Sequence, residues 1–359
     1  MTRAAVLRAI GDEKLDVVDI GLEPVAARQV RVRIHATGVC HSDLSAMRGL
    51  IPQPVPFVPG HEGAGEVVEV GPGVTEVGVG DHVIVAWMPP CGRCRYCLGS
   101  QPELCMEVTI SAGFAPRFTV DGKPCYGMAG CGTFSEEVVL PAEGVVKIPD
   151  DVPWDVASLI GCGVTTGVGA AINKAKVVPG SSVVVFGCGG VGVNVIQGAR
   201  LAGAAEIVAV DLVEGRREEA RQFGATHTAS PDDLAALSAE LTGGHGFDYG
   251  FEVIGLPTTI RATYDAVRRG GTATIVGMGS AEKMVEFNAF ELFFNEKVLV
   301  GSLYGSADVR TEFHRLIRLW RNGRLDLEGL ISKRGTLDDI NIAFEDMKAG
   351  RVIRTVIEL

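Results

Sequence analysis

The sequence predicts an α/β protein with two parts, a barrel-like and mainly antiparallel β region followed by a doubly wound parallel sheet. Short β-rich runs and turn signals crowd roughly the first 155 residues, a spacing typical of barrels. From Ala157 onward, apolar strands alternate with helical segments, which is the pattern of parallel βαβ units. A chain of 359 residues is also long for a single hydrophobic core, so two domains are expected.

The first region is expected to consist of antiparallel strands joined by short turns. Runs rich in β-forming residues cover 30–35, 65–70 and 81–86, and the first of them alternates between apolar and polar residues. The second run leads directly into the glycine-proline turn 71–73. Strands that are this short and separated by turn residues favour a barrel over a single extended sheet.

The second region is expected to form buried parallel strands linked by helices. Apolar runs have the composition of strands covered on both faces, and the segments between them have helical periodicity. A terminal stretch then carries one amphipathic helix and a final β-like run. In chain order, the predicted strands are 182–186, 206–210, 248–254 and 272–276, the predicted helices are 214–223, 258–269 and 311–322, and the last run is 352–357.

Composition excludes several classes of function. The formal net charge of −11 argues against nucleic acid as a partner, because phosphate binding depends on cationic side chains. Although 47% of the residues are hydrophobic, no stretch is expected to span a membrane, and the N-terminal segment lacks the apolar core of a secretory signal. The nine cysteines, an odd number, indicate a reducing compartment, so the protein is expected in the cytoplasm.

A glycine-rich motif follows the first predicted parallel strand. Gly187-Cys188-Gly189-Gly190-Val191-Gly192 matches the G-x-G-x-x-G pattern and leads into a predicted helix. Such glycines let the backbone approach a pyrophosphate at the helix N-terminus. Asp211 ends the next strand, where it can bind both adenosine ribose hydroxyls and repel a 2′-phosphate, which favours NAD over NADP. Arg216 could soften that repulsion, and a plain turn beside a solvated aspartate is the alternative.

Four cysteines lie close together at positions Cys91, Cys94, Cys97 and Cys105. Thiolates with this spacing can converge on one tetrahedral ion, for which zinc is the usual choice. Because four protein ligands leave no open position, such an ion would brace a lobe spanning about residues 88–110 and would not take part in catalysis. An iron–sulfur cluster is the alternative, although the wide last gap differs from ferredoxin spacing.

Cys40, His61 and Cys162 lie outside this cluster and each has a simple explanation when taken alone. A single buried cysteine usually behaves as a small apolar residue, and a histidine in a glycine-rich turn is usually just hydrogen-bonded. Only their combination makes a second metal site worth considering.

Taken together, these segments resemble the zinc-dependent medium-chain alcohol dehydrogenases over essentially the whole chain. The motif Gly60-His61-Glu62-Gly63-Ala64-Gly65 matches the family signature, with Gly71 and Val74 at the expected spacing. The motifs 38–43, 91–105, 159–167 and 187–192 then occur in the family's order. The resemblance implies a GroES-like catalytic domain over 1–160, a Rossmann domain over 161–303, and a return segment over 304–359 that completes the catalytic domain.

The resemblance also implies the reaction and its metal ions. The expected reaction interconverts a primary or secondary alcohol and its aldehyde or ketone, with hydride transfer to or from NAD. A catalytic zinc ion is expected on Cys40, His61 and Cys162, with an open position for the substrate oxygen, besides the structural zinc ion of the four cysteines. Glu62 and Asp43 match positions beside the catalytic metal, and Asp43 is expected to orient the imidazole of His61.

Further positions correspond to the family's proton relay, cofactor site and substrate pocket. Ser42 matches the hydroxyl of the relay, whereas Ser45 stands where many members have a histidine, so the outer relay departs from the pattern. His41 and Arg354 match pyrophosphate-binding positions, Thr166, Val191 and Val276 match positions around the nicotinamide, and Trp87 and Met128 match substrate-pocket positions.

Two other functions stay open at this point. A thiol-dependent formaldehyde dehydrogenase, acting on an S-hydroxymethyl thiol, would use the same zinc and NAD sites, since specificity lies in the pocket lining. A non-catalytic NAD-binding relative is a more distant alternative. A small-molecule substrate is expected in either enzyme, and the chain is expected to form a homodimer, with a tetramer as the alternative.

Overall fold

A computed structural model describes all 359 residues, and the chain divides into two compact units. The first unit contains residues 1–162 and 308–359, and the second contains residues 163–307. The expected boundary at 160/161 would have assigned Cys162 to the second unit. Cys162 is the last residue of the first segment of the first unit, and its sulfur converges there with the side chains of Cys40 and His61. The predicted fold class is confirmed, with a mainly β first unit and a parallel α/β second unit.

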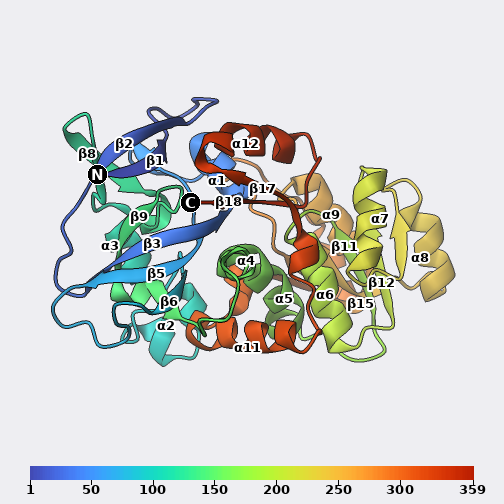
Figure 1. Ribbon diagram of the computed structural model, residues 1–359. Coiled ribbons are helices and arrows are strands. Elements are labelled where there is room, and N and C mark those ends of the chain that lie inside the picture. The colour runs from blue at the N-terminus through green and yellow to red at the C-terminus, as the bar shows by residue number, and fades with distance from the viewer. The chain divides into compact units, whose positions relative to one another are not determined.

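The first unit contains two mainly antiparallel sheets (Figure 1). One has the order β1-β2-β7-β8-β4, and the other has the path β10-β6-β5-β3-β18-β17 with β9 on β3. The strands are β1 (Thr2–Val6), β2 (Asp16–Leu22), β3 (Gln29–Gly38), β4 (Phe57–Val58), β5 (Glu62–Val70), β6 (His82–Val85), β7 (Phe118–Val120), β8 (Lys123–Gly127), β9 (Glu137–Pro141), β10 (Val145–Lys147), β17 (Ile331–Thr336) and β18 (Arg354–Glu358). The helices are α1 (His41–Met47), α2 (Arg95–Leu98), α3 (Glu107–Gly113), α4 (Trp154–Leu159), α11 (Val309–Arg321) and α12 (Ile340–Lys348).

Strand β3 is central to the first unit because it pairs with β5, β9 and β18. Its alternation places Val30, Val32 and Ile34 in the core, where each is at most 1% exposed. The C-terminal strand β18 runs antiparallel to β3, so the last residues of the chain complete a sheet begun by the first forty. The predicted helix 311–322 is confirmed as α11, but the expectation of a single tail helix is wrong, because α12 forms as well.

Helix α4 is anchored at its first residue by an aromatic stack. The indole of Trp154 lies between the imidazole of His35 on β3, at 4.6 Å between ring centroids, and that of His82 on β6, at 4.1 Å. After α4 the helix widens into a π-helical turn, Ile160–Val164, that carries Cys162. The anchor therefore lies on the same continuous helical segment as one of the expected metal ligands.

The second unit is built on a six-stranded parallel sheet with the order β13-β12-β11-β14-β15-β16. Its strands are β11 (Ser182–Phe186), β12 (Glu206–Val210), β13 (His227–Ala229), β14 (Phe247–Glu252), β15 (Val267–Ile275) and β16 (Val298–Gly301), and its helices are α5 (Thr165–Gly169), α6 (Gly192–Ala202), α7 (Glu214–Gln222), α8 (Leu234–Thr242), α9 (Pro257–Ala266) and α10 (Ala289–Asn295). The strand order reverses direction between β11 and β14, which makes this pair the topological switch point where doubly wound sheets bind ligands.

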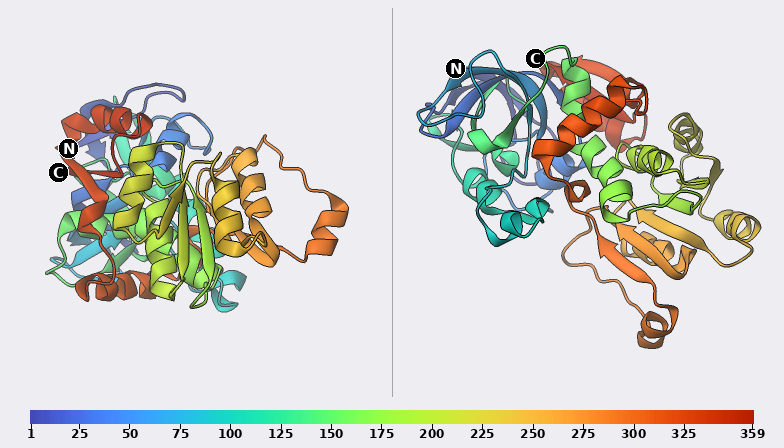
Figure 2. Two further views of the ribbon diagram at one scale, coloured as in Figure 1. Left: turned by 90° about the vertical axis from the view of Figure 1, so that its right-hand side faces the viewer. Right: turned by 90° about the horizontal axis from the view of Figure 1, so that it is seen from below.

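Both faces of this sheet are apolar, which explains its continuous hydrophobic strands. Val184, Phe186, Val208 and Val210 form one core cluster with the leucines of α8 and the alanines of α9. Between β15 and β16 the chain leaves the sheet as a projecting arm, residues 277–297, which contains α10 (Figure 2). The helix predicted over 258–269 is shorter than expected, because residues from Val267 onward already belong to β15.

One helical stretch corrects an expectation about membrane segments. The stretch Trp154–Lys174 is long and apolar enough, by length and composition alone, to cross a membrane, although no such stretch was expected. Its most apolar window is 83% buried within the protein. Burial to this extent is what a core helix shows, so the stretch is weak evidence for a membrane span.

Candidate active site

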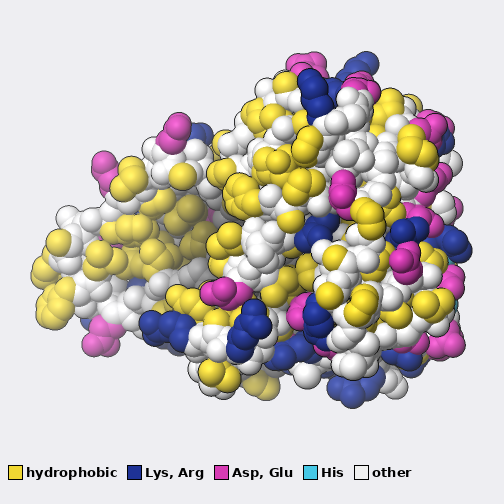
Figure 3. Space-filling model, turned by 90° about the vertical axis from the view of Figure 1, so that its left-hand side faces the viewer, with side chains coloured by type: hydrophobic (Ala, Val, Ile, Leu, Met, Phe, Trp, Pro, Cys, Tyr) yellow, Lys and Arg dark blue, Asp and Glu magenta, His cyan; other side chains and the backbone are white.

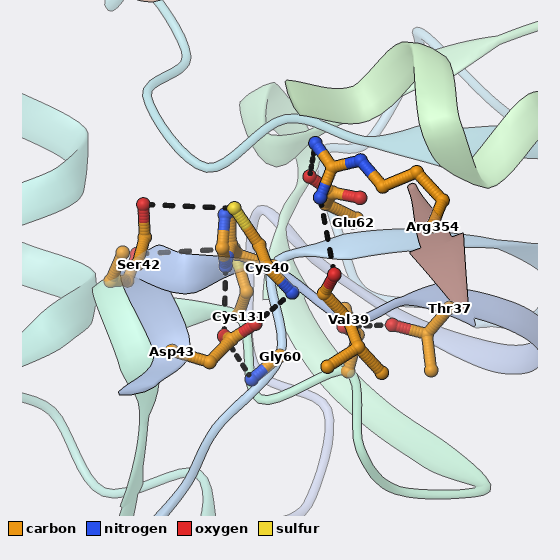
Figure 4. Close-up of polar contacts among 12 residues, drawn as sticks. Thr37, Val39, Cys40, Ser42, Asp43, Gly60, Glu62, Cys131 and Arg354 are labelled. Carbon is orange, nitrogen blue, oxygen red and sulfur yellow. Dashed lines mark hydrogen bonds and ion pairs between the residues drawn. The ribbon is translucent and has the colours of Figure 1, made fainter. Parts of the chain in front are cut away.

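Asp43 organises the first half of the candidate site from the start of helix α1. Its buried carboxylate accepts hydrogen bonds from the backbone N–H groups of Cys40 and Gly60, both at 3.0 Å (Figure 4). It also accepts the Nδ1–H of His61 at 2.9 Å, which is the contact expected from the sequence. With its proton held on Nδ1, the ring of His61 has Nε2 available as a ligand atom.

Cys40, His61, Glu62 and Cys162 converge on one point, with all of their ligand atoms within 4.8 Å of one another. Each of these side chains is at most 6% exposed. A hydrogen bond from the Cys162 thiol is the largest effect on Cys40 and lowers the pKa of its thiol well below the ordinary value. Two thiols and an imidazole at these distances form a donor set that fits zinc, which would displace the protons between them.

A buried ion pair lies beside this donor set. The guanidinium of Arg354 on β18 is 3.1 Å from Oε1 of Glu62, while its Nη1 donates to the carbonyl oxygen of Val39 at 3.1 Å (Figure 4). Burial raises the pKa of Glu62 to about 7, although the charge of Arg354 opposes that shift. Apart from this ion pair, neither carboxylate oxygen of Glu62 accepts a hydrogen bond. The structure thus places Arg354 against the candidate metal cluster, and its predicted contact with a pyrophosphate stays a prediction.

The predicted relay and pocket residues surround the same cluster. The hydroxyl oxygen of Ser42 lies 3.7 Å from the sulfur of Cys40, and Ser45 follows one helical turn later on α1. The indole of Trp87 meets the ring of His61 edge to face, with 6.3 Å between the ring centroids. Met128 is buried in the hydrophobic core of the first unit. Ser42 and Trp87 are therefore close to the candidate metal, whereas no contact of Met128 with it is seen.

The four-cysteine lobe forms a separate cluster in the first unit. Cys91, Cys94, Cys97 and Cys105 bring their sulfurs within 4.8 Å of one another, and two sulfur–sulfur distances are 3.6 and 4.0 Å. A tetrahedron with Zn–S bonds of about 2.3 Å separates its sulfurs by about 3.8 Å, so the observed spacing fits a structural zinc ion. The backbone N–H of Arg93 is the largest effect that lowers the pKa of the Cys91 thiol, to about 7.

The glycine-rich motif lies at the carboxyl edge of the parallel sheet, as predicted. Gly187 follows β11 with φ +97°, a conformation that favours glycine, and Gly192 begins helix α6. Asp211 follows β12, and its carboxylate accepts the backbone N–H groups of Cys188 and Val213, both at 2.9 Å. The motif and the acidic residue are thus joined by a direct hydrogen bond, which fits the phosphate and ribose ends of a dinucleotide.

Comparisons with known proteins agree with this arrangement. The family described as "Alcohol dehydrogenase GroES-like domain" matches residues 26–150, and "Zinc-binding dehydrogenase" matches residues 190–322. S-(hydroxymethyl)glutathione dehydrogenase of Paracoccus denitrificans is 40% identical, with 99% of each chain covered. The chain belongs to the zinc-dependent medium-chain alcohol dehydrogenase family. It is therefore an oxidoreductase that interconverts an alcohol and a carbonyl compound.

Other alcohol dehydrogenases also match this chain over nearly its whole length. NDMA-dependent alcohol dehydrogenase of Amycolatopsis methanolica is 39% identical over 99% of this chain and 98% of its own length. Among solved structures, benzyl alcohol dehydrogenase of Acinetobacter calcoaceticus superposes with a TM-score of 0.91 at 31% identity, covering 100% of this chain and 99% of its own. Substrates differ among these relatives, so family membership leaves the natural alcohol undefined.

The remaining predicted residues of this alcohol dehydrogenase are divided between the two units. His41 is exposed at the start of α1 in the first unit. Thr166, Val191, Arg216 and Val276 lie in the second unit, on α5, at the N-terminus of α6, on α7 and after β15. The structure does not test their contacts with a cofactor, so these roles stay predictions.

Two side chains near the dinucleotide motif were missed by sequence reasoning. Arg217, next to the predicted Arg216, donates from Nη1 to the carbonyl oxygen of Asp211 at 2.8 Å. Glu252 is fully buried at the end of β14 and accepts three hydrogen bonds. The signal for Glu252 was available, because an acidic residue lies inside the predicted buried strand 248–254 between apolar neighbours.

Proposed function

We propose that this enzyme oxidises primary or secondary alcohols with NAD and carries one catalytic and one structural zinc ion per chain. The convergence of Cys40, His61 and Cys162, with His61 held by Asp43, is the observation that carries the proposal. These donors come from three distant parts of the sequence, and a purely structural fold would have no reason to bury them together. The open Cys₂His set is the arrangement that catalytic zinc sites use.

When bound, zinc supplies a Lewis acid for the alcohol oxygen, and the nicotinamide accepts the hydrogen that leaves carbon. The chain's own residues set the protonation state of His61 and carry away the proton of the alcohol. Asp43 keeps the Nδ1 proton of His61, so that Nε2 faces the two sulfurs. Ser42, whose hydroxyl oxygen lies 3.7 Å from the sulfur of Cys40, is proposed to accept the proton of the alcohol. Ser45, one turn further along α1, is proposed to pass this proton on to solvent.

The second unit supports NAD as the cofactor in preference to NADP. Both carboxylate oxygens of Asp211 are held by backbone N–H groups, so the carboxylate has a fixed orientation at the end of β12. A fixed negative charge here favours a ribose diol over a 2′-phosphate. The guanidinium of Arg217 is directed to the backbone carbonyl oxygens of Asp211 and Leu212, where it supports the turn.

Metal analysis and turnover test the proposal together. Elemental analysis of the purified enzyme should find two zinc ions per chain, and alcohols should reduce NAD at the absorbance band of NADH. Cys162→Ser should remove one zinc ion and abolish turnover, while leaving the ion of the four-cysteine lobe. One zinc ion in the unsubstituted enzyme, or equal turnover in the variant, would contradict the proposal.

A thiol-dependent reaction is the second candidate, because a 40%-identical relative is named S-(hydroxymethyl)glutathione dehydrogenase. The same zinc donors and dinucleotide motif would serve that reaction, since specificity depends on the pocket lining. NAD reduction with formaldehyde should be measured with and without glutathione or mycothiol. Turnover that requires the thiol would favour this candidate, whereas equal or better turnover with simple alcohols would favour the first.

We also propose that the enzyme is a homodimer paired through β16. This strand ends one edge of the parallel sheet, and its Val298 and Leu299 are 45% and 39% exposed. On the neighbouring arm, Phe290 and Phe293 of α10 are also exposed, and hydrophobic side chains cover much of the projecting arm (Figure 3). An apolar edge strand of this kind is a template for a second copy across a two-fold axis.

Light scattering tests the dimer with a matched control. The double variant Val298→Lys, Leu299→Lys should elute as a monomer, because lysines on an edge strand block pairing. Ile342→Lys replaces an apolar residue of similar exposure, 48%, on α12 of the first unit and should leave the dimer intact. A tetramer in the unsubstituted protein would mean that a further surface associates as well.

We propose the cytoplasm as the location. All nine cysteines are free in the structure, and six of them belong to the two metal clusters. Thiol ligands of this kind persist where the compartment is reducing. Cell fractionation that found the enzyme in an oxidising compartment would contradict this proposal.

A further inference from the structure

Glu252 stands out among the buried charged side chains that the proposed chemistry does not use. It is the last residue of β14 and is 0% exposed. Strand β14 pairs with β11 on one side and β15 on the other, with Glu252 opposite Phe186 and Ile275. Because β11 and β14 form the topological switch point, Glu252 lies directly beneath the place where a doubly wound sheet binds its ligand.

One oxygen of this carboxylate holds the turn that follows β14. Oε1 accepts the backbone N–H groups of Ile254 at 3.0 Å and Gly255 at 2.7 Å, and the hydroxyl of Thr259 at 2.6 Å. Thr259 lies in the first turn of α9, so a single oxygen ties the turn 253–256 to the start of the helix. Hydrogen bonds to a charged acceptor are stronger than neutral ones, which makes this a rigid turn.

The same residue reaches the turn that follows β15. Its backbone carbonyl oxygen accepts the N–H groups of Val276 at 2.8 Å and Gly277 at 3.0 Å. The second carboxylate oxygen, Oε2, is buried without a hydrogen-bond partner and lies 2.7 Å from where a Cβ on Gly277 would be. A side chain at Gly277 would also come within 2.3 Å of the backbone nitrogen of Gly255, so the two turns are in direct contact.

The glycine-rich motif and the strand before it contact the turn 253–256. A Cβ on Gly187 would lie 2.8 Å from Cγ1 of Ile254, whose side chain is 46% exposed. The backbone N–H of Val253 also donates to the carbonyl oxygen of Phe186 at 3.0 Å, just before the motif. Three turns, 187–192, 253–256 and 276–279, therefore meet around Glu252.

We propose that Glu252 is a positioning residue for dinucleotide binding. Its carboxylate holds the turn 253–256 in place, so that the edge of the sheet at the switch point is already shaped when the dinucleotide arrives. The inference deepens the proposed function and rests on its assignment of NAD. Preformed turns avoid an ordering cost on binding, so loss of this carboxylate should weaken the cofactor complex more than it weakens the fold.

Asp248 offers a matched control on the same strand. Its carboxylate also accepts three hydrogen bonds, from the backbone N–H and the hydroxyl of Ser182 at 2.8 and 3.0 Å and from Nε of Arg268 at 2.7 Å. It lies four residues before Glu252, about 13 Å away along the strand, near the amino ends of the parallel strands. Glu252→Ala and Asp248→Ala therefore remove similar bonds, but only the first removes them at the end of the sheet that carries the glycine-rich motif.

The experiment measures NADH binding to the holoenzyme by fluorescence titration, well below the melting temperature of each variant. Glu252→Ala should raise the Kd for NADH about tenfold, as expected for loss of a preformed turn, while Asp248→Ala should change it less than about twofold. Glu252→Gln keeps an oxygen acceptor and should restore most of the affinity. With saturating NAD, kcat of Glu252→Ala should stay within about twofold of the unsubstituted enzyme while KM for NAD rises.

Equal Kd values for Glu252→Ala and Asp248→Ala would overturn the inference, because a merely structural carboxylate predicts that result. If Glu252→Ala does not fold, Thr259→Val and Thr259→Ser replace it, since only the first loses the donor to Oε1. A weaker NADH complex in Thr259→Val alone would then support the inference, and equal affinity in both would overturn it. If the unsubstituted enzyme binds only NADPH, the assignment of NAD is wrong, and the same variants are compared with NADPH.

Discussion

Replacing Trp154 with alanine should loosen the catalytic metal site without touching any of its ligands. The indole is stacked between His35 and His82, and helix α4, which it begins, continues into the π-helical turn that carries Cys162. Removing the indole frees the start of this helix. The sulfur of Cys162 should then be held less firmly against Cys40, and the catalytic zinc ion should dissociate faster.

The size of the effect follows from the burial and the ring contacts. Truncating a fully buried tryptophan costs about 3–5 kcal/mol, and the half-buried Trp154 should lose about half of this. Each of the two ring contacts adds roughly 0.5–1.5 kcal/mol, so the total is about 4 kcal/mol. In a unit of this size, that corresponds to a fall in melting temperature of about 8–16 °C.

The assay follows zinc release with a coloured chelator, alongside thermal unfolding. Trp154→Ala should release one zinc ion faster than the unsubstituted enzyme and retain the ion of the four-cysteine lobe. Trp154→Phe keeps a ring between the two imidazoles. Its rate of zinc release should therefore lie between those of the unsubstituted enzyme and Trp154→Ala. Trp320→Ala is the control, because Trp320 is also half-buried in the first unit, while its indole N–H donates to the carboxylate of Glu328, which lies beyond the end of its own helix, α11.

Two results would refute the reasoning. A melting temperature within about 2 °C of the unsubstituted enzyme would show that the stack contributes little to stability. Equal zinc release in Trp154→Ala and Trp320→Ala would show that the stack has no particular connection with Cys162.

Three further outcomes are expected. Burial is the main effect that lowers the pKa of His35, and the charge of Glu66 partly offsets it. The neutral ring therefore contributes to the free energy of unfolding above pH 6.5, and this contribution is lost as pH falls through the pKa of the folded state. His35→Gln should therefore show a smaller fall in melting temperature between about pH 7 and pH 5 in scanning calorimetry. Cys94→Ser should reduce zinc from about two ions to one per chain by elemental analysis, since four thiolates complete the structural site. Gly277→Ala should destabilise the protein by about 1–3 kcal/mol in denaturant titration, because its Cβ would meet the nitrogen of Gly255.

Much of the fold could be predicted because its signals are local. The strands of the second unit have the continuous apolar composition of a buried parallel sheet, and β11 and β12 were predicted with the correct ends. Helix α12 was not predicted, because its amphipathic pattern is weaker than that of α11. The end of α9 was placed too late, because an arginine-rich segment suits a helix as well as the start of β15.

The same distinction between local signals and distant contacts applies to the candidate site. The types of ligand were evident from short motifs, since thiols and imidazoles in characteristic spacings are limited to a few uses. The convergence of Cys162 with Cys40 and His61 was expected only from the family resemblance, because it depends on where distant segments lie in space. The pyrophosphate role of Arg354 stays a prediction, whereas its contact with Glu62 was not evident from the sequence, because that contact depends on the pairing of β18 with β3.

Local sequence was enough to predict the candidate metal donors of this enzyme, its dinucleotide motif and the order of its domains. Tertiary structure alone decided which side chains act on one another, such as Trp154 between two histidines and Glu252 beneath three turns. The physical reason is that contacts between distant segments depend on strand pairing and register, which a local pattern does not encode. A motif can identify a candidate ligand side chain, but only the packing of distant segments determines which residues hold that side chain in place.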